Sequence, residues 1–134
     1  MEEKMNKKLI SICVLIALLI GACITEQVMA HNFFNNIKEN VYYISDYVQD
    51  KEDINTPDIY DLVVSLEEKW TGYEHALCFL INNMDIEDIG VELTKMKIYV
   101  LENDVVEFKA SLAQVLYFAD SYEWIMGINF QNVF

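Results

Sequence analysis

The sequence has few residues that break helices or build tight catalytic loops. Its 134 residues include four glycines and one proline. It contains no Gly-rich phosphate loop, no Gly-x-Ser-x-Gly motif and no Ser-x-x-Lys motif. Catalysis needs convergent polar groups, and the sequence shows no such set. We therefore predict that this protein is not an enzyme.

Positive charge is also scarce. The chain has no arginine, and its nine lysines face 22 aspartates and glutamates, for a net charge of −13. A field this negative repels phosphate backbones, which excludes nucleic acid as a partner. It also repels anionic lipid headgroups, so we expect the folded domain to stand off the membrane surface.

Cysteine is too rare for disulfide bonds to stabilise the fold. Cys13 and Cys23 lie in the N-terminal apolar stretch, and Cys78 is the single cysteine of the remaining chain. One cysteine cannot form an internal disulfide, so the fold must rest on its hydrophobic core. With 54 % hydrophobic residues, the chain has enough apolar surface for such a core.

The sequence does contain a clear N-terminal targeting pattern. Lys4, Lys7 and Lys8 precede an apolar run over residues 9–24. This pattern is typical of an export signal or N-terminal membrane anchor. The positive-inside rule places the N-terminus in the cytoplasm and the rest of the chain outside it. We predict that residues 1–24 are a lipoprotein-type signal or an N-terminal membrane anchor, with the C-terminal domain extracytoplasmic at the cell membrane.

Three interpretations of this segment remain open. Ile20-Gly21-Ala22-Cys23 resembles a lipobox, after which residues 1–22 are removed and Cys23 is lipidated. The apolar run is shorter than the roughly 20 residues of a usual spanning helix, but it could serve as an uncleaved anchor. The third interpretation is full secretion after Val28-Met29-Ala30.

Four apolar stripes follow, and each alternates steps of three and four residues. This spacing keeps apolar side chains on one helical face, and strand-like alternation is absent. Short connections make consecutive helices antiparallel. The sequence therefore predicts an all-α, up-and-down bundle of about four helices. We expect the helices near residues 26–50, 57–82, 86–102 and 104–126.

The expected domain organisation follows from these helices. Residues 25–56 form a juxtamembrane helix and an acidic loop, and residues 57–134 form a helical domain. The first helix could instead stand partly apart as a stalk continuous with the anchor.

Local residue chemistry supports two of the helix starts. Thr56 before Pro57 predicts an N-cap, and Asp104 with Glu107 predicts a capping box. Gly72 suggests a close helix crossing.

We also predict which side chains are buried and which are exposed. The core members are Trp70, Leu77, Leu93, Leu112 and Val115. Tyr73, Tyr99, Phe108, Tyr117, Tyr122 and Trp124 fall mostly at stripe spacing, which also indicates core. Glu67, Glu68, Glu87, Asp88 and Glu92 are expected to be surface charge.

Two groups of residues have the chemistry of metal ligands. His75 and Cys78 lie three apart on one helix, but structural zinc needs four ligands and the only other histidine is His31. We therefore expect packing there. The loop residues Asp50, Glu52, Asp53, Asn55 and Asp58 lack the glycine and bidentate glutamate of an EF-hand. The loop over residues 50–58 is therefore predicted to be solvated, and no metal or cofactor is expected.

The C-terminal tail is unusually apolar. Gly127 is expected to end the last helix, after which come Ile128, Phe130, Val133 and Phe134. These side chains either cap the open end of the bundle or dock into a partner, with the terminal carboxylate captured by backbone N–H groups.

The second half of the chain resembles a known family. The similarity rests on Leu66-Glu-Glu-Lys-Trp70, Leu77-Cys-Phe-Leu-Ile81, Asp85-Ile-Glu-Asp-Ile89 and the terminal Asn132-Val-Phe134. The family is a clostridial-type group of membrane-anchored bacterial proteins classed as a domain of unknown function (DUF 4363). The resemblance implies the same order of anchor and exported helical domain. It also implies an integral membrane protein as a candidate partner, and it implies no activity.

From these observations we expect a non-enzymatic, membrane-tethered, extracytoplasmic interaction or accessory protein. Its partners would be the membrane, through the N-terminus, and an integral membrane protein. No small-molecule substrate is identified. The alternative is an exported helical protein that binds a small ligand or a cation.

Overall fold

The computed structural model describes residues 2–77 and 86–126, and all of its regular structure is helical. The helices are α1 (Glu2–Val48), α2 (Pro57–Leu77), α3 (Glu87–Glu102) and α4 (Val105–Met126). No strand occurs in these two ranges. The predicted all-α class is confirmed.

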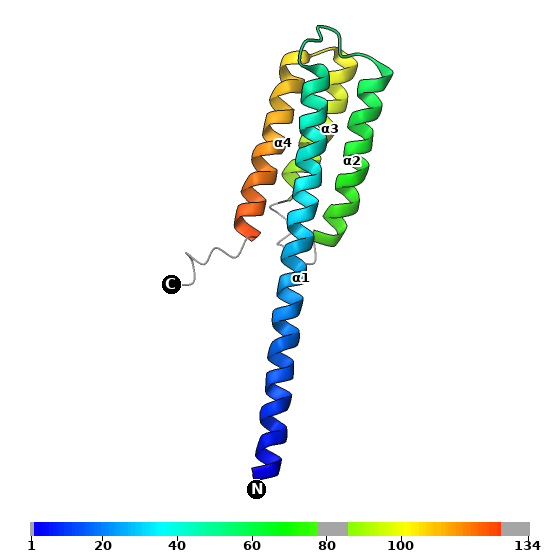
Figure 1. Ribbon diagram of the computed structural model, residues 1–134. Helices are drawn as coiled ribbons and strands as arrows, with labels where there is room; N and C mark the ends of the chain where they lie inside the picture. The colour runs from blue at the N-terminus through cyan, green and yellow to red at the C-terminus, as the bar shows by residue number, and fades with distance from the viewer. Residues whose placement is uncertain (1, 78–85, 127–134) are drawn as a thin grey trace.

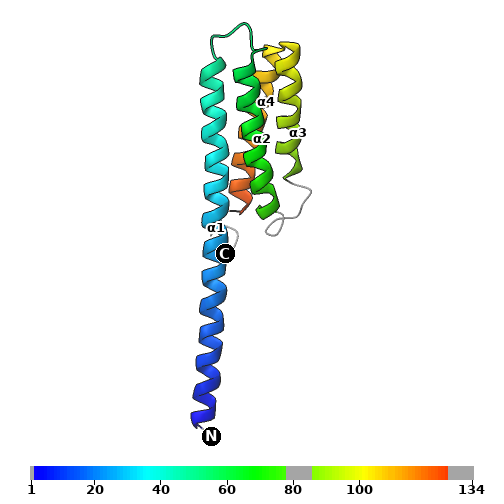
Figure 2. The same cartoon turned by 90° about the vertical axis from the view of Figure 1, so that its right-hand side faces the viewer.

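The four helices form an up-and-down bundle (Figures 1 and 2). Each helix packs against its neighbour in the chain, and α4 closes the ring by packing against α1. The loop after α1 and the turn between α3 and α4 lie at one end of the bundle. The end of α4 lies at the other end, beside the middle of α1.

Helix α1 is far longer than the other three, because its N-terminal half projects out of the bundle (Figure 1). At 1.5 Å per residue, its 47 residues span about 70 Å. From Lys7 onward, the first buried side chain is Ala30, and from there to Val48 α1 contributes a full bundle helix. The two alternatives for the first helix are therefore combined: it is a stalk in its first half and a bundle member in its second.

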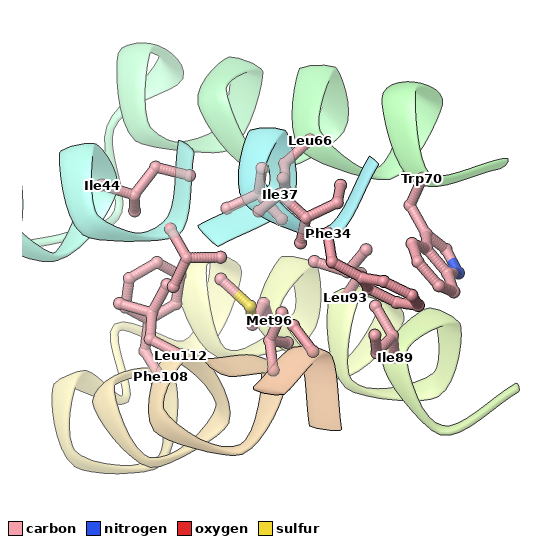
Figure 3. Packing of buried hydrophobic residues seen from close by; sticks show 14 of the residues in the cluster. Phe34, Ile37, Ile44, Leu66, Trp70, Ile89, Leu93, Met96, Phe108 and Leu112 are labelled. Atoms are coloured by element: carbon pink, nitrogen blue, oxygen red, sulfur yellow. The ribbon is translucent and has the colours of Figure 1, made fainter. Parts of the chain in front are cut away.

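The core runs along the bundle axis and takes side chains from every helix (Figure 3). All five predicted core members are buried, which confirms those assignments. Phe34, Ile37 and Ile44 of α1 face Leu66 and Trp70 of α2, with Met96 and Phe108 on the opposite side.

The predicted helix starts are also confirmed. The backbone N–H of Ile59 donates to Thr56 Oγ1 over 3.4 Å, and that of Glu107 donates to Asp104 Oδ1 over 3.1 Å. Each cap satisfies a donor that the first turn leaves free. Between α3 and α4, Asn103 adopts a left-handed conformation with φ 56°, which permits the abrupt reversal.

The loop before α2 is tied to this reversal. Ile54 is fully buried, and its N–H donates to Asn103 Oδ1 over 2.8 Å. The Asn55 amide donates to the carbonyl oxygen of Leu101 over 3.0 Å. These bonds join the two connections at the end of the bundle farthest from the N-terminus.

Several sequence-based assignments were wrong. No atom lies within 4 Å of a Cβ added at Gly72, so this glycine marks no close crossing, whereas a Cβ added at Gly90 would contact the Trp70 side chain. Glu92 was assigned to the surface, but it is 5 % exposed. Tyr117 and Trp124 were assigned to the core, but they are 69 % and 66 % exposed.

Candidate functional site

The projecting half of α1 exposes apolar side chains all round. Its large hydrophobic residues between Leu9 and Met29 are 40–67 % exposed. The hydroxyls of Ser11 and Thr25 donate to the carbonyl oxygens four residues earlier, over 3.0 and 2.9 Å. Polar groups satisfied within the helix are compatible with a surrounding that offers no hydrogen bonds.

Among the described residues, α1 is the one helix that is both long enough and apolar enough to cross a membrane. A signal sequence near the N-terminus has the same length and composition. Cys23 lies exposed on this part of α1. From Ile24, the last residue of the apolar run, to Ala30, the first buried residue, the helix rises about 9 Å. The bundle thus begins directly beyond the apolar run.

At this junction a polar cluster connects α1 to the end of α4. Lys38 donates to Glu123 and, over 3.0 Å, to Asp120; His31 also contacts Glu123. Burial lowers the pKa of Lys38, but the hydrogen bonds to the two carboxylates outweigh it, and the pKa is raised. Burial likewise raises the pKa of Glu123, but its bonds to Lys38 and His31 outweigh that effect and lower the pKa.

A second polar cluster lies between α3 and α4. Glu92 accepts hydrogen bonds from Ser111 Oγ over 2.8 Å and from Lys95 Nζ over 2.7 Å. The hydrogen bond to Glu92 raises the pKa of Lys95. Because both carboxylate oxygens have partners, the buried position of Glu92 is accounted for structurally.

Helix α4 has two apolar stripes on opposite faces. One contains Phe108, Leu112, Val115, Ala119 and Tyr122, which are buried in the core. The other contains Val106, Ala110, Ala113, Tyr117 and Trp124, which are exposed. At 100° per residue, the mean directions of the two stripes differ by about 180°. We call the exposed set the outer α4 stripe.

Beside α4, an open hollow of about 520 Å³ is lined by Tyr117, Asp120, Ser121 and Trp124. A second open hollow, of about 330 Å³, lies between α1 and α2 at Tyr43, Tyr47, Asp58, Asp61 and Leu62. Both are surface depressions without a convergent set of polar groups.

The third hollow is the groove between α2 and α3, with a volume of about 460 Å³. Trp70 and Gly90 line it, together with carboxylates from both helices. We call it the α2–α3 groove. All three volumes fall within the range of small-molecule sites, so the size of these hollows permits ligand binding.

The predicted metal-ligand candidates do not come together in the described part of the chain, where no group of three or more metal-binding side chains occurs. The expectation that His75 packs in the bundle is wrong, because this residue is exposed and its Nδ1 lies 2.8 Å from the carbonyl oxygen of Thr71. Asp50, Glu52 and Asp53 are exposed as expected of a solvated loop, and Asp53 accepts from the N–H of Asn55. Cys78 and the tail residues Phe130, Val133 and Phe134 lie outside the described residues.

No family model, curated protein or solved structure matches this chain. The resemblance to the family of unknown function therefore stays a prediction.

Sequence reasoning missed both the outer α4 stripe and the α2–α3 groove. For the stripe there was a signal, because Val106, Ala110, Ala113 and Tyr117 repeat at steps of four, three and four. Both faces of α4 carry aromatic residues at helical spacing, so the spacing alone does not tell which face is buried. For the groove no signal existed, since it depends on which faces of α2 and α3 meet.

Proposed function

We propose that this protein is a membrane-anchored, extracytoplasmic interaction protein that performs no catalysis. The observation that carries the proposal is the outer α4 stripe. Contiguous exposed apolar surface on a small domain marks a site of association. The aromatic residues Tyr117 and Trp124 are of the type enriched at the centres of protein interfaces.

The orientation of the stripe restricts the partner. Helix α4 packs against the bundle half of α1, so the stripe runs parallel to the helix that bears the apolar run. Trp124 follows Glu123, which contacts His31 near the start of the bundle. A partner that covers the stripe from Trp124 to Val106 must therefore stand upright beside the membrane, as a membrane-anchored protein does.

Charge argues against a second copy of this chain as that partner. Two copies in parallel orientation would bring Asp120 near its counterpart, and each chain has a net charge of −13. Like charges across an interface are unfavourable. We propose a different membrane-anchored protein, whose exported part offers an apolar face bordered by basic residues.

The test is photo-crosslinking in intact membranes. A photoreactive amino acid in place of Tyr117 should capture a single membrane protein, whereas the same group in place of Ser65, an exposed residue of α2, should not. Replacing Val106 with aspartate in the Tyr117 probe should abolish the crosslink. Equal labelling from both positions, or a crosslink only to a second copy of the chain, would contradict the proposed heterologous partner.

The mode of anchoring needs its own experiment. If the lipobox is used, Cys23→Ser should leave a heavier, unprocessed precursor, and the unaltered protein should incorporate radiolabelled palmitate. If palmitate never enters the protein, the uncleaved anchor is the better proposal. Protease treatment of intact cells tests the topology, because an extracytoplasmic bundle should be digested and a cytoplasmic one should not.

The second candidate function is binding of a small exported ligand, and the α2–α3 groove favours it. Both functions can coexist, because the groove and the outer α4 stripe share no residue.

A further inference from the structure

The α2–α3 groove contains a buried hydrogen-bond donor that no group of the described residues satisfies. The Trp70 side chain is 1 % exposed, and its Nε1 has no hydrogen-bond partner within residues 2–77 and 86–126. Native proteins rarely leave a buried N–H unpaired, because the group has lost its bond to water and gained nothing. Figure 3 shows this nitrogen at the edge of the core cluster, on the side away from Phe34 and Leu93.

Gly90 explains why the groove reaches this nitrogen. A Cβ on Gly90 would lie 3.4 Å from Trp70 Nε1 and 3.7 Å from its Cδ1. Both residues line the groove, so the missing side chain leaves the indole edge open to it. Gly72 provides the contrast, since an added Cβ there meets nothing within 4 Å.

The charges of the groove are only partly neutralised. Glu67 accepts hydrogen bonds from Lys97 and Thr94, and Lys95 is bound to Glu92. Glu74 and Glu87 also line the groove, one from each helix, and the structure records no ion pair for either within the described ranges. The groove therefore presents two carboxylates and one N–H donor.

We propose that the α2–α3 groove binds an alkylammonium group with a neighbouring oxygen acceptor. The ammonium pairs with Glu74 and Glu87, and the oxygen accepts the hydrogen bond from Trp70 Nε1. Val91 and the indole edge pack against the aliphatic part. This chemistry occurs in a free amino acid with a basic side chain and in a lysine residue of a peptide.

The two tryptophans make binding measurable in the full-length protein in detergent. Trp124→Phe leaves Trp70 as the only indole fluorophore. Titration with free L-lysine and with the capped peptide acetyl-Gly-Lys-Gly-amide should shift the Trp70 emission saturably, with half-saturation at about 1 mM or below for at least one probe. The matching norleucine probes, N-acetyl-norleucine and acetyl-Gly-Nle-Gly-amide, have no ammonium group and should give no shift. A saturable response to free lysine alone assigns the site to a small molecule, and a response to the peptide assigns it to a protein segment.

Two alanine variants separate binding from folding. Gly90→Ala and Gly72→Ala make the same change in helix propensity, and each should leave thermal melting unchanged or slightly raised. Only Gly90→Ala places a methyl group over Trp70 Nε1, so it should weaken binding about tenfold or more. Gly72→Ala should bind as the unaltered protein does.

A second set of variants tests the carboxylates without touching the core. Replacing Glu74 and Glu87 together by glutamine should weaken binding about tenfold or more and leave melting unchanged. Glu68→Gln, an exposed residue of α2 outside the groove, is the control. The proposal is overturned if neither ammonium probe shifts the Trp70 emission or if the norleucine probes act equally. Binding that survives both the Gly90→Ala and the double glutamine change would overturn it too.

Discussion

The projecting half of α1 and the outer α4 stripe both expose apolar side chains, and they do so in different ways. The projecting half of α1 is apolar all round, and none of the side chains described between Lys7 and Met29 is buried. The outer α4 stripe is confined to one face of a helix whose opposite face is in the core. A helix surrounded by apolar side chains suits lipid, whereas a single stripe bordered by polar residues suits a protein surface. The pattern around the helix axis, more than the amount of apolar surface, distinguishes the two environments.

The largest expected effect separates the two faces of α4. Leu112→Ala removes a side chain that is 2 % exposed and should lower the free energy of unfolding by about 2–5 kcal/mol. Tyr117→Ala on the outer stripe should change it by less than about 0.5 kcal/mol. Chemical denaturation of the full-length protein in detergent, followed by circular dichroism, measures both. A loss from Tyr117→Ala as large as that from Leu112→Ala would show that the outer stripe belongs to the fold.

The next prediction compares α1 with α4 by introducing the same charge into each. Ile16→Arg places an arginine in the middle of the apolar run, at a cost of about 2.5–3.5 kcal/mol for membrane insertion. Membrane fractionation should show reduced anchoring. Ala113→Arg, on the outer α4 stripe, should leave the protein in the membrane fraction and abolish the crosslink from the photoreactive residue at position 117. If Ile16→Arg remains fully membrane-bound, the apolar run of α1 is not the anchor.

A smaller effect is expected from the buried carboxylate of α3. Glu92→Ala leaves the buried Ser111 hydroxyl without its acceptor and should destabilise the bundle by about 1–3 kcal/mol. Glu87→Ala, one turn and a half earlier and exposed, should change the stability by no more than about 0.5 kcal/mol. Thermal melting of the two variants, measured side by side, compares their losses of stability. Equal melting temperatures would return Glu92 to the surface role that the sequence suggested.

The smallest effect concerns the junction between the two regions. The pKa of Glu123 is lowered from 4.5, so its contribution to stability is present above pH 4.5 and is lost as the pH falls through the folded-state pKa. The pKa of Lys38 is raised from 10.5, so its contribution is present below pH 10.5 and is lost as the pH rises through its folded-state pKa. Such a contact contributes about 0.2–1 kcal/mol.

Glu123→Gln should therefore flatten part of the acid limb of the stability–pH profile and leave the plateau slightly lower. Glu107→Gln, which removes an exposed carboxylate of the same helix that has no ion pair among the described residues, serves as the comparison. An acid limb identical to that of the unaltered protein would show that the α1–α4 contact contributes nothing.

Much of the fold was predictable from spacing and local chemistry. Steps of three and four residues identified the core faces, and Thr56 and Asp104 marked two helix starts, because these signals act within one or two helical turns. The apolar run after Lys8 likewise predicted a helix of membrane-spanning character. The prediction that the first helix begins near residue 26 missed the continuity of α1, since nothing between Thr25 and Ala30 breaks a helix.

Only the tertiary structure decided which faces of the helices pack against one another. Glu92 has the composition of a surface residue, yet the packing of α3 against α4 buries it next to Ser111. Trp70 was correctly assigned to the core, but its unpaired Nε1 and the approach of Gly90 depend on the separation of α2 and α3. By itself, the sequence determined an apolar N-terminal helix and a helical bundle with a defined core, because those depend on periodicity along the chain. The α2–α3 groove was decided by the tertiary structure, because it depends on how two helices pack against each other. For α4 the sequence contained both apolar stripes, and only the packing of the helix decided which of them is buried.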